Sequence, residues 1–289
     1  MKGNKLTNAS SSPTIKPLSD IALLIEFYPA IISEEINDQV HQLAYHLENV
    51  PLAGVTELVP AYSSLAVFYN PLMKTYDQMK ALMEERLQAL YEKNTDKAKT
   101  NEFFKERRLI TIPVLYGGEL GPDIEIVAEH NQLSIEEVVK IHTSREYRVY
   151  MMGFSPGFPY LGGMSEEIAT PRHEVPRVKV QAGSVGIAGS QTGIYPLDSP
   201  GGWQIIGKTP VPLFNISNFP KPHHDPHFQL KGTEHQEGAY HSSFPVLIRA
   251  GDTIRFTEID EQEFDFIMSE VQAGSYQPMI EKYSCQGGE

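Results

Sequence analysis

The sequence GFSPGFPYLGG at residues 153–163 opens a glycine-rich segment that ends at Gly207. This segment holds half of the 22 glycines of the chain and its single tryptophan, Trp203. Glycine loses much backbone entropy on folding and offers no side chain to pack, so this density indicates tight turns or close approach to another molecule. Aromatic residues lie among these glycines. Rigid apolar rings beside backbone N–H groups are typical of a ligand pocket or an interface.

The composition predicts an ordinary globular protein of one large domain or two average ones. The 289 residues are 40% hydrophobic and 21% charged. A net charge of -13 disfavours binding to nucleic acid or to an anionic membrane, because both need clustered cations. Residues 1–10 lack the apolar core of a signal peptide, and no window approaches the ~20 apolar residues of a membrane span. The single cysteine, Cys285, allows no internal disulfide and indicates a cytoplasmic protein.

The first part of the chain is predicted to be a small α+β domain. Residues 1–14 are polar and are expected to form a mobile tail. Residues 15–94 follow with the expected element order ββαββα. Ser33 begins the first predicted helix as its N-cap, and Met79 and Met83 on the second helix are interpreted as core residues. The predicted strands are residues 15–18, 21–27, 55–60 and 65–69. Residues 95–107 are charged, lack apolar periodicity and are predicted to be a linker.

Residues 108–289 are predicted to form a second, mainly β domain. Short apolar runs are separated by Gly and Pro about every 10 residues, a spacing that favours a barrel over a doubly wound sheet. Residues 219–245 hold half of the ten histidines and show no strand or helix pattern. We expect them to be an inserted surface loop. The strands expected in this domain are residues 109–116, 147–152, 184–188, 203–206 and 253–257.

Helix signals also occur in this second domain. Pro122 is expected at the first position of a short helix. Ser134 with Glu137 and Asp260 with Glu263 have the spacing of capping boxes for two further helices. The apolar face of the last helix is expected to consist of Phe264, Ile267, Met268 and Val271.

Two short motifs match known catalytic patterns, but their surroundings contradict both. Residues 153–157 fit the G-x-S-x-G nucleophile elbow, which requires a helix directly after the serine. Pro159 and the glycines at 162 and 163 prevent that helix, so Ser155 is interpreted as a turn residue. Residues 202–209 fit the phosphate-binding pattern G-x-x-x-x-G-K-T. The strand-like run before Gly207 and the prolines after it favour a barrel strand instead.

Polar residues near the glycine-rich segment offer a candidate site. Asp198 lies between prolines and glycines that restrict its backbone, and the cations Arg172 and Lys208 lie nearby in sequence. A rigid aspartate with cations fits acid–base catalysis or anion binding. A turn-capping aspartate with solvated cations fits equally well. The pair His224 and His227 lies in a loop without fixed geometry, so we expect no metal site.

Several longer motifs resemble the family of 5-oxoprolinase B subunits, also called allophanate hydrolase subunit 1 or the sporulation-kinase inhibitor family. The resemblance covers roughly residues 15–215 and resumes at Phe244. The chain departs from the family at Val180-Gln181, where the family reads Val-Pro, and in its histidine-rich insertion. The matching motifs are VPAY (59–62), YGGELGPD (116–123), YRVYMMGFSPGFPYLGG (147–163), TPR (170–172) and AGSVGIAGSQTGIYPLDSPGGWQIIGKT (182–209).

The resemblance implies a small N-terminal α+β domain followed by a cyclophilin-like β-barrel. It also implies two partners, 5-oxoprolinase subunits C and A, which together with the B subunit open 5-oxoproline to glutamate with ATP and Mg²⁺ used by the complex. The residues then expected to carry catalysis are Asp198, Arg172 and Lys208. Those expected to contact substrate or partner are Gly153, Phe154, Ser155, Pro156, Gly157, Phe158, Pro159, Tyr160, Gln191, Thr192, Tyr195, Ser199, Pro200, Gly201, Gly202 and Trp203.

The family leaves two further functions open. One is a regulatory protein that inhibits a sporulation sensor histidine kinase through the Pro- and aromatic-rich surface of the barrel. The other is a component of a urea- or allophanate-type carboxyltransferase and amidohydrolase system. Both the enzyme and the inhibitor readings predict an adhesive surface near residues 154–160, so these residues do not separate them.

Overall fold

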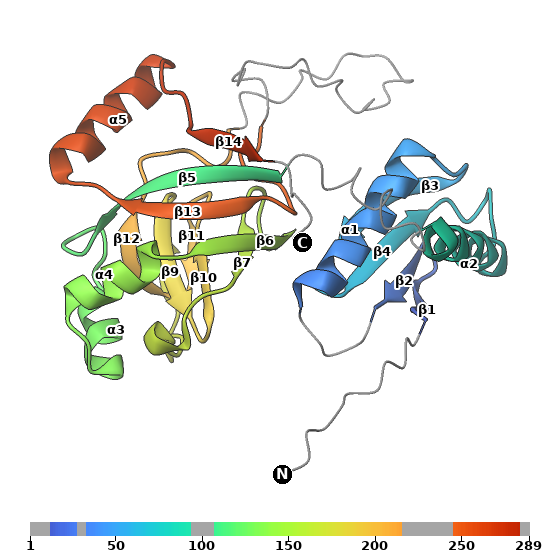
Figure 1. Cartoon of the computed structure of the whole chain (residues 1–289), viewed down its shortest axis with the longest axis horizontal. Coiled ribbons are helices and arrows are strands. Elements are labelled where there is room, and N and C mark those ends of the chain that lie inside the picture. Colours follow the sequence, from blue (N-terminus) through green and yellow to red (C-terminus); the bar gives the residue numbers. More distant parts are fainter. Residues whose placement is uncertain (1–11, 28–32, 94–106, 216–244, 284–289) are drawn as a thin grey trace, which may run out of the picture. The chain divides into compact units, whose positions relative to one another are not determined.

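A computed structural model describes residues 12–27, 33–93, 107–215 and 245–283. These residues belong to two compact units, one before residue 94 and one from Arg107 to Tyr283 (Figure 1). Most of the predicted tail 1–14, linker 95–107 and histidine-rich loop 219–245 lies outside the described residues. Among the described residues, no helix is long and apolar enough to cross a membrane.

The N-terminal unit is a four-stranded antiparallel sheet packed with two helices. Its sheet order is β1-β2-β4-β3. The strands and both helices share one apolar core, and Met79 and Met83 are fully buried within it, as predicted. The elements in chain order are β1 (Thr14–Ser19), β2 (Ala22–Glu26), α1 (Glu34–Asn49), β3 (Val55–Pro60), β4 (Ser64–Tyr69) and α2 (Tyr76–Lys93).

The second unit is a mainly β structure with helices at its periphery. Its first elements are β5 (Arg107–Tyr116), α3 (Ile124–Asn131), α4 (Ile135–Thr143), β6 (Glu146–Met152), β7 (Pro159–Gly162) and the short 3-10 helix η2 (Glu166–Ile168). Five short strands follow, β8 (Arg177–Val180), β9 (Ser184–Ala188), β10 (Gln191–Ile194), β11 (Ser199–Gly201) and β12 (Gln204–Lys208). The last elements are β13 (Thr253–Glu258), α5 (Glu261–Ala273) and β14 (Ile280–Tyr283).

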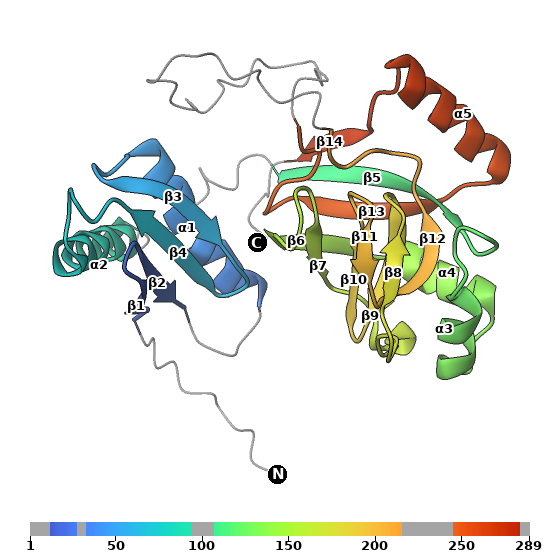
Figure 2. The same ribbon diagram turned by 180° about the vertical axis from the view of Figure 1, so that it is seen from behind.

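Seven of these strands close into a barrel. The sheet order is β12-β9-β10-β7-β6-β13-β5-β14, and β12 also pairs with β5. Closure removes the exposed edges that an open sheet would present. The strands β8 and β11 form a separate ribbon on the side of this unit that faces the reader in Figure 2. The prediction of a small α+β part followed by a mainly β barrel is therefore confirmed.

Glycine makes the barrel closure possible. Gly207 pairs with Tyr116 where β12 meets β5, and a Cβ atom at this position would lie 2.7 Å from the carbonyl oxygen of Leu115. A Cβ at Gly121 would lie 2.2 Å from the carbonyl oxygen of Ile206. Real Cβ atoms do not approach backbone this closely, so part of the glycine density serves contacts within the fold.

The predicted helix caps are largely confirmed. Ser33 accepts a hydrogen bond from the backbone N–H of Ile36, and Ser134 and Asp260 each form a complete capping box. The prediction for Pro122 is wrong, because α3 begins at Ile124 with Asp123 in the N-cap position. Asp123 does not cap the helix with its side chain, which bonds to other parts of the barrel instead.

The predicted apolar face of the last helix, α5, is half-buried: Phe264, Ile267, Met268 and Val271 are all less exposed than most of the helix. None of its 13 residues, all of which the structure describes, is buried. In Figure 1 it lies at the outside of the barrel unit, above β5 and β13. Ile267 packs against the barrel core while Phe266 is 62% exposed.

A buried histidine links helix α4 to the barrel interior. Nδ1 of His142 lies 2.7 Å from the Tyr116 hydroxyl, and Nε2 lies 2.8 Å from the Thr192 hydroxyl. His142 is fully buried, and its burial lowers its pKa to about 3. The neutral ring is therefore the stable form in the folded protein, where its two hydrogen bonds hold α4 against the barrel.

We predict that acid destabilises the protein through His142. The pKa of the histidine is about 6.5 in the unfolded chain and about 3 in the folded one, so stability is full above 6.5 and falls as the pH drops toward 3. Lowering the pH from about 7.5 to about 5 should cost about 2 kcal/mol of unfolding free energy. In His142→Gln this part of the decrease should vanish. Urea unfolding followed by Trp203 fluorescence measures both; equal pH slopes would contradict the assignment.

A buried ion pair fixes the start of β5. Nε of Arg108 donates to Oδ1 of Asp252 at 2.8 Å, and its Nη2 donates to Oδ2 of Asp252 and to the carbonyl oxygen of Leu247. The backbone N–H of Arg249 also donates to Asp252. Burial raises the pKa of Asp252 although Arg108 opposes this. The pair holds the turn at residues 247–252 against the first strand of the barrel.

Removing one member of this pair should be costly. Asp252→Ala leaves the buried guanidinium of Arg108 without its carboxylate, and we predict a loss of about 3–5 kcal/mol of unfolding free energy. The exposed pair of Arg255 and Glu146 is a suitable control. Arg255→Ala should cost less than about 1 kcal/mol, because solvent screens exposed pairs. Urea unfolding measures both losses. Similar losses in both variants would show that the buried pair stabilises the fold no more than the exposed pair does.

Candidate functional site

A cluster of aromatic rings lies under the glycine-rich segment, separate from the main barrel core. Phe158 packs edge-on against Tyr195 and Trp203, with ring centroids 5.7 Å apart in both pairs. Val180 of the outer ribbon and Ile205 of β12 belong to the same cluster. The rings are buried, so they hold the overlying turns rigid and do not themselves form an open contact surface.

The turn at residues 153–158 is held by its own backbone. The N–H of Gly153 donates to the carbonyl oxygen of Phe158, and the N–H of Phe158 donates to that of Ser155 at 3.1 Å. Strand β7 begins at Pro159, so no helix follows the serine. This confirms that the nucleophile-elbow match at Ser155 is a turn.

The phosphate-loop match is also a strand. Residues Gln204 to Lys208 form β12, which pairs with β9 on one side and with β5 at Gly207 and Lys208. The two ladders use backbone groups that a phosphate cradle would need, and no helix follows Lys208 among the described residues up to 215. The interpretation as a barrel strand is confirmed.

Asp198 lies in an exposed polar group at the end of the ribbon. Its Oδ1 accepts from the backbone N–H of Ala182 at 2.8 Å, and its Oδ2 lies 2.7 Å from Nζ of Lys179. Hydrogen bonds from Lys179 and Ala182 lower the pKa of Asp198. Nζ of Lys208 donates to Gln181 Oε1 at 2.6 Å, and partial burial lowers the pKa of Lys208. The fold therefore gathers Asp198 with Lys208, as the sequence suggests.

A second and more buried group centres on Asp123. Its Oδ1 accepts from Nη2 of Arg177 at 2.6 Å, and its Oδ2 accepts from the backbone N–H of Ile205 at 2.6 Å. Nε2 of His173 lies 3.3 Å from Oδ2 and 2.8 Å from Nη1 of Arg177. Burial alone would raise the pKa of Asp123, but the hydrogen bonds from Arg177, Ile205 and His173 outweigh it and lower the pKa.

The segment that carries His173 and Arg177 lies along the glycines at 201 and 202. The N–H of His173 donates to the carbonyl oxygen of Gly202 at 2.7 Å, and Gln204 Nε2 donates to that of Pro171. The guanidinium of Arg172 lies 5.9 Å from the centroid of the Trp203 ring, within cation–π range. Side chains of His173 and Arg177 remain 24% and 34% exposed, so solvent reaches both.

The structure thus separates the three expected catalytic residues into two groups. Asp198 and Lys208 lie in the exposed group, while Arg172 stacks on Trp203 beside the Asp123 group. The β8–β11 ribbon connects them, since Arg177 pairs with Gly201 and Val180 pairs with Ser199.

The expected contact residues fall into exposed and buried sets. Phe154, Pro156 and Pro200 are exposed, and Gly153, Ser155, Tyr160, Gln191, Ser199, Gly201 and Gly202 are half-buried. Gly157, Phe158, Pro159, Tyr195 and Trp203 are buried and support the surface from below. Thr192 is fully buried and bonds to His142, which places it in the barrel interior.

Sequence reasoning misses the Asp123 group as a unit. In the sequence Asp123 is only the last residue of a turn motif, and His173 lies beside Arg172 without a partner at a recognisable spacing. The structure gives His173 two charged neighbours, 50 and 4 positions away in the chain. The one available signal is an aspartate directly before a helix, and it does not reveal partners so distant in sequence.

Comparison with known proteins shows the family of this chain. The family described as "Carboxyltransferase domain, subdomain C and D" matches residues 13–223. The chain belongs to this carboxyltransferase family. The 5-oxoprolinase B subunit of Bacillus subtilis (strain 168) is 43% identical over 260 residues, which are 86% of this chain and 94% of that protein. The corresponding protein of Escherichia coli O157:H7, also a 5-oxoprolinase B subunit, is 38% identical over 83% of this chain and 93% of that protein.

A solved structure of a more distant protein shares the fold. The K. lactis urea amidolyase aligns over 96% of this chain with a TM-score of 0.70 and 16% identity. At this identity the similarity shows the fold alone. The alignment covers 17% of the K. lactis chain, so the same fold occurs there inside a much longer polypeptide.

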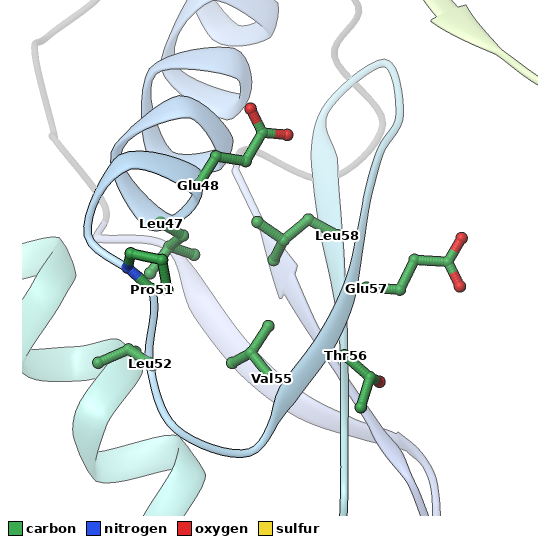
Figure 3. A pocket seen from close by; sticks show the side chains of 8 residues that line it. All are labelled: Leu47, Glu48, Pro51, Leu52, Val55, Thr56, Glu57 and Leu58. Carbon is green, nitrogen blue, oxygen red and sulfur yellow. The ribbon is translucent and has the colours of Figure 1, made fainter. Parts of the chain in front are cut away.

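One surface pocket lies far from these groups in sequence, in the N-terminal unit. It has a volume of about 210 Å³ between the end of α1 and strand β3, and it is open to solvent. Figure 3 shows leucine and valine side chains at its centre, with Glu48 and Glu57 pointing away. It contains no cation and no aromatic ring among its lining residues, so it lacks the chemistry of the Asp123 group. Among the described residues, no group of three or more His, Cys, Asp or Glu side chains could hold a metal ion.

We predict that Asp123 contributes far more than Asp198 to the free energy of unfolding. Asp123→Ala leaves Arg177 and the N–H of Ile205 without their acceptor and should cost about 3–5 kcal/mol of unfolding free energy. Asp198→Ala, at an exposed carboxylate of the neighbouring group, should leave the unfolding curve near that of the wild type. Urea unfolding followed by Trp203 fluorescence compares them. If Asp198→Ala proves the more destabilising, the organising residue has been misassigned.

Proposed function

We propose that this chain is the B subunit of an ATP-dependent 5-oxoprolinase and acts with subunits C and A. The observation that carries this proposal is the 43% identity to a 5-oxoprolinase B subunit over nearly the full length of both proteins. The complex would convert 5-oxo-L-proline, ATP and water to L-glutamate. The chain is then inactive alone and contributes one part of a shared active site.

The reaction defines what such a site must supply. A lactam resists attack by water, and phosphorylation of its amide oxygen by ATP would make the carbonyl carbon more electrophilic. Water would then add to this carbon, the C–N bond would break as the ring nitrogen takes up a proton, and the acyl phosphate left behind would be hydrolysed to glutamate and phosphate. Cations and backbone N–H groups then stabilise the negative charge that develops. Arg172, Arg177 and the half-buried glycines 201 and 202 are the groups of this chain that fit that requirement.

Residues 202–209 do not fit a nucleotide site. Residues 202–209 match a phosphate-loop pattern, but their backbone is used in strand pairing with β9 and β5. Lys208 bonds to Gln181 instead of pointing into a loop of free N–H groups. We therefore propose that other members of the complex bind ATP and Mg²⁺, and that this chain contacts only the substrate and the phosphoryl group transferred to it.

His173 is the proposed proton carrier of this chain. Arginine has only donors, so in the neutral ring Nε2 accepts from Arg177 and Nδ1 carries the proton. Nε2 also lies 3.3 Å from Oδ2 of Asp123, so this carboxylate fixes the position of the ring. Asp123 thus acts as a positioning residue, and His173 donates a proton to the nitrogen released when the lactam opens.

Asp198 and Lys208 have a second proposed role in the same site. Their exposed group carries Lys179 as well, so two cations flank one carboxylate. We assign them to binding the anionic substrate or the developing phosphate, with Asp198 setting the position of Lys179. Ser199 and the exposed Pro200 directly follow Asp198 in the chain and are proposed contacts. Gln191, at the opposite end of β10, is a proposed contact outside this group.

The same proposal includes the type of barrel, the division into domains and the cellular location of the protein. We infer that the barrel is of the cyclophilin-like type, that residues 15–94 and 108–289 act as separate domains, and that the protein works in the cytoplasm. The seven-stranded closure, the division of the described residues into two units and the single cysteine support these three points.

The test combines the three purified proteins with ATP and 5-oxoproline and measures glutamate. We expect glutamate only when all three proteins and ATP are present. His173→Ala should lower the rate by about a hundredfold or more if the ring transfers a proton. Glu174→Ala, the exposed neighbouring residue, is the matched control and should leave the rate unchanged.

Three results would reject the proposal. Absence of glutamate from the complete mixture would remove the 5-oxoprolinase assignment. Conversion of urea in its place, or inhibition of sensor kinase autophosphorylation by this chain alone, would identify one of the other two functions open to the family.

A further inference from the structure

Phe154 has an unusual backbone conformation for a large side chain. Its φ angle is +61°, and among the described residues only Gln132 is another non-glycine residue with positive φ. Gln132 ends helix α3, where a left-handed residue is common and its N–H satisfies helical carbonyls. Phe154 ends no helix. A bulky residue in this region is strained, and such strain persists where the surrounding structure imposes it.

The strained residue is also exposed. Phe154 is 67% exposed, although an apolar ring of this size gains most from burial. Its ring packs edge-on against Phe158, with centroids 5.5 Å apart. Phe158 in turn packs on Trp203, whose ring lies under Arg172. The exposed ring is therefore the outer end of an aromatic stack that reaches the candidate site.

The turn that carries Phe154 is braced against movement. Gly157 has a φ angle of +83°, and a Cβ at this position would lie 3.0 Å from Cβ of Phe214 and 3.3 Å from Cβ of Pro196. Pro156 and Pro159 restrict the backbone on both sides of this glycine. A rigid turn that presents an exposed aromatic ring loses little entropy on binding, which is the property of an interface anchor.

We propose that Phe154 is the anchor by which this chain docks into an apolar pocket of the C subunit. The inference rests on the proposed function. The expected ligand of Phe154 is a protein and not the substrate, because small molecules bind in pockets that enclose them and the Phe154 side chain is exposed on the surface. The relatives that match over nearly their full length are B subunits of 5-oxoprolinase, and the family match covers only subdomains C and D of a carboxyltransferase domain. A further polypeptide is thus expected beside this one.

Docking of Phe154 would also connect the partner to the chemistry. The Phe154 ring contacts Phe158, and Phe158 contacts Trp203 beneath the guanidinium of Arg172. A shift of the Phe154 ring on docking would therefore be transmitted through these contacts to Arg172. The C subunit would then complete the site from the side on which this aromatic stack reaches the surface.

The substitution Phe154→Gly provides a test with two opposite effects. Glycine adopts positive φ without strain, so Phe154→Gly should raise the thermal unfolding midpoint while it removes the anchor. We expect its affinity for the C subunit to fall about tenfold or more. Phe154→Asn, which also tolerates this conformation, should give the same pair of changes. The matched control is Phe266→Ser on α5, which removes a ring of similar exposure, 62%, and should leave the affinity unchanged.

The measurement is calorimetric titration of each variant with the purified C subunit from the same organism, without ATP or 5-oxoproline. Stronger folding together with weaker binding in both Phe154 variants supports the proposal. Wild-type affinity in Phe154→Gly, an equal loss in Phe266→Ser, or no binding by the wild-type chain would each overturn it. A complex that forms normally yet makes no glutamate would count against the proposed reaction and leave the docking intact.

Discussion

A single buried carboxylate, that of Asp123, joins the parts of the barrel that form the candidate site. It binds the backbone of β12 through Ile205 and the first residue of β8, Arg177, with His173 of the preceding segment beside it. The main chain reinforces this link, because the N–H of Asp123 donates to the carbonyl oxygen of Ile205. A charge with this little access to solvent is stable only while its donors stay in place. The position of His173 and Arg177 therefore depends on the same contact that joins α3 to the barrel.

The glycines of the central segment have two uses that the sequence does not separate. Their density predicts contact with another molecule, and part of that prediction needs correction. At Gly193 and Gly201 the space of a side chain is filled by Trp203 and Tyr195, so these glycines serve internal packing. Gly202 differs, because a Cβ there would meet nothing closer than 3.6 Å. Gly202 and the exposed Phe154 therefore remain the proposed contact surface.

Local signals are readable from the sequence, and distant pairings are not. Capping residues such as Ser134 and Asp260 act within one turn of helix, so their spacing alone predicts them correctly. Neighbouring prolines forbid the helix that each short catalytic motif requires, and this is enough to reject both. Asp123 and Arg177 are 54 positions apart, and only barrel closure brings them together. The exposure of α5 is also unreadable, since an apolar stripe does not show how deeply it will be covered.

The central claim is that a protein partner completes the site around Asp123 and the glycines beside it. Hydrogen–deuterium exchange of the chain, alone and with subunits C and A, tests this directly. The account predicts slower exchange in the complex at residues 153–158, 170–177 and 201–204, with little change in the strands of the N-terminal sheet. Unchanged exchange in all three segments, with protection confined to other parts of the chain, would contradict it.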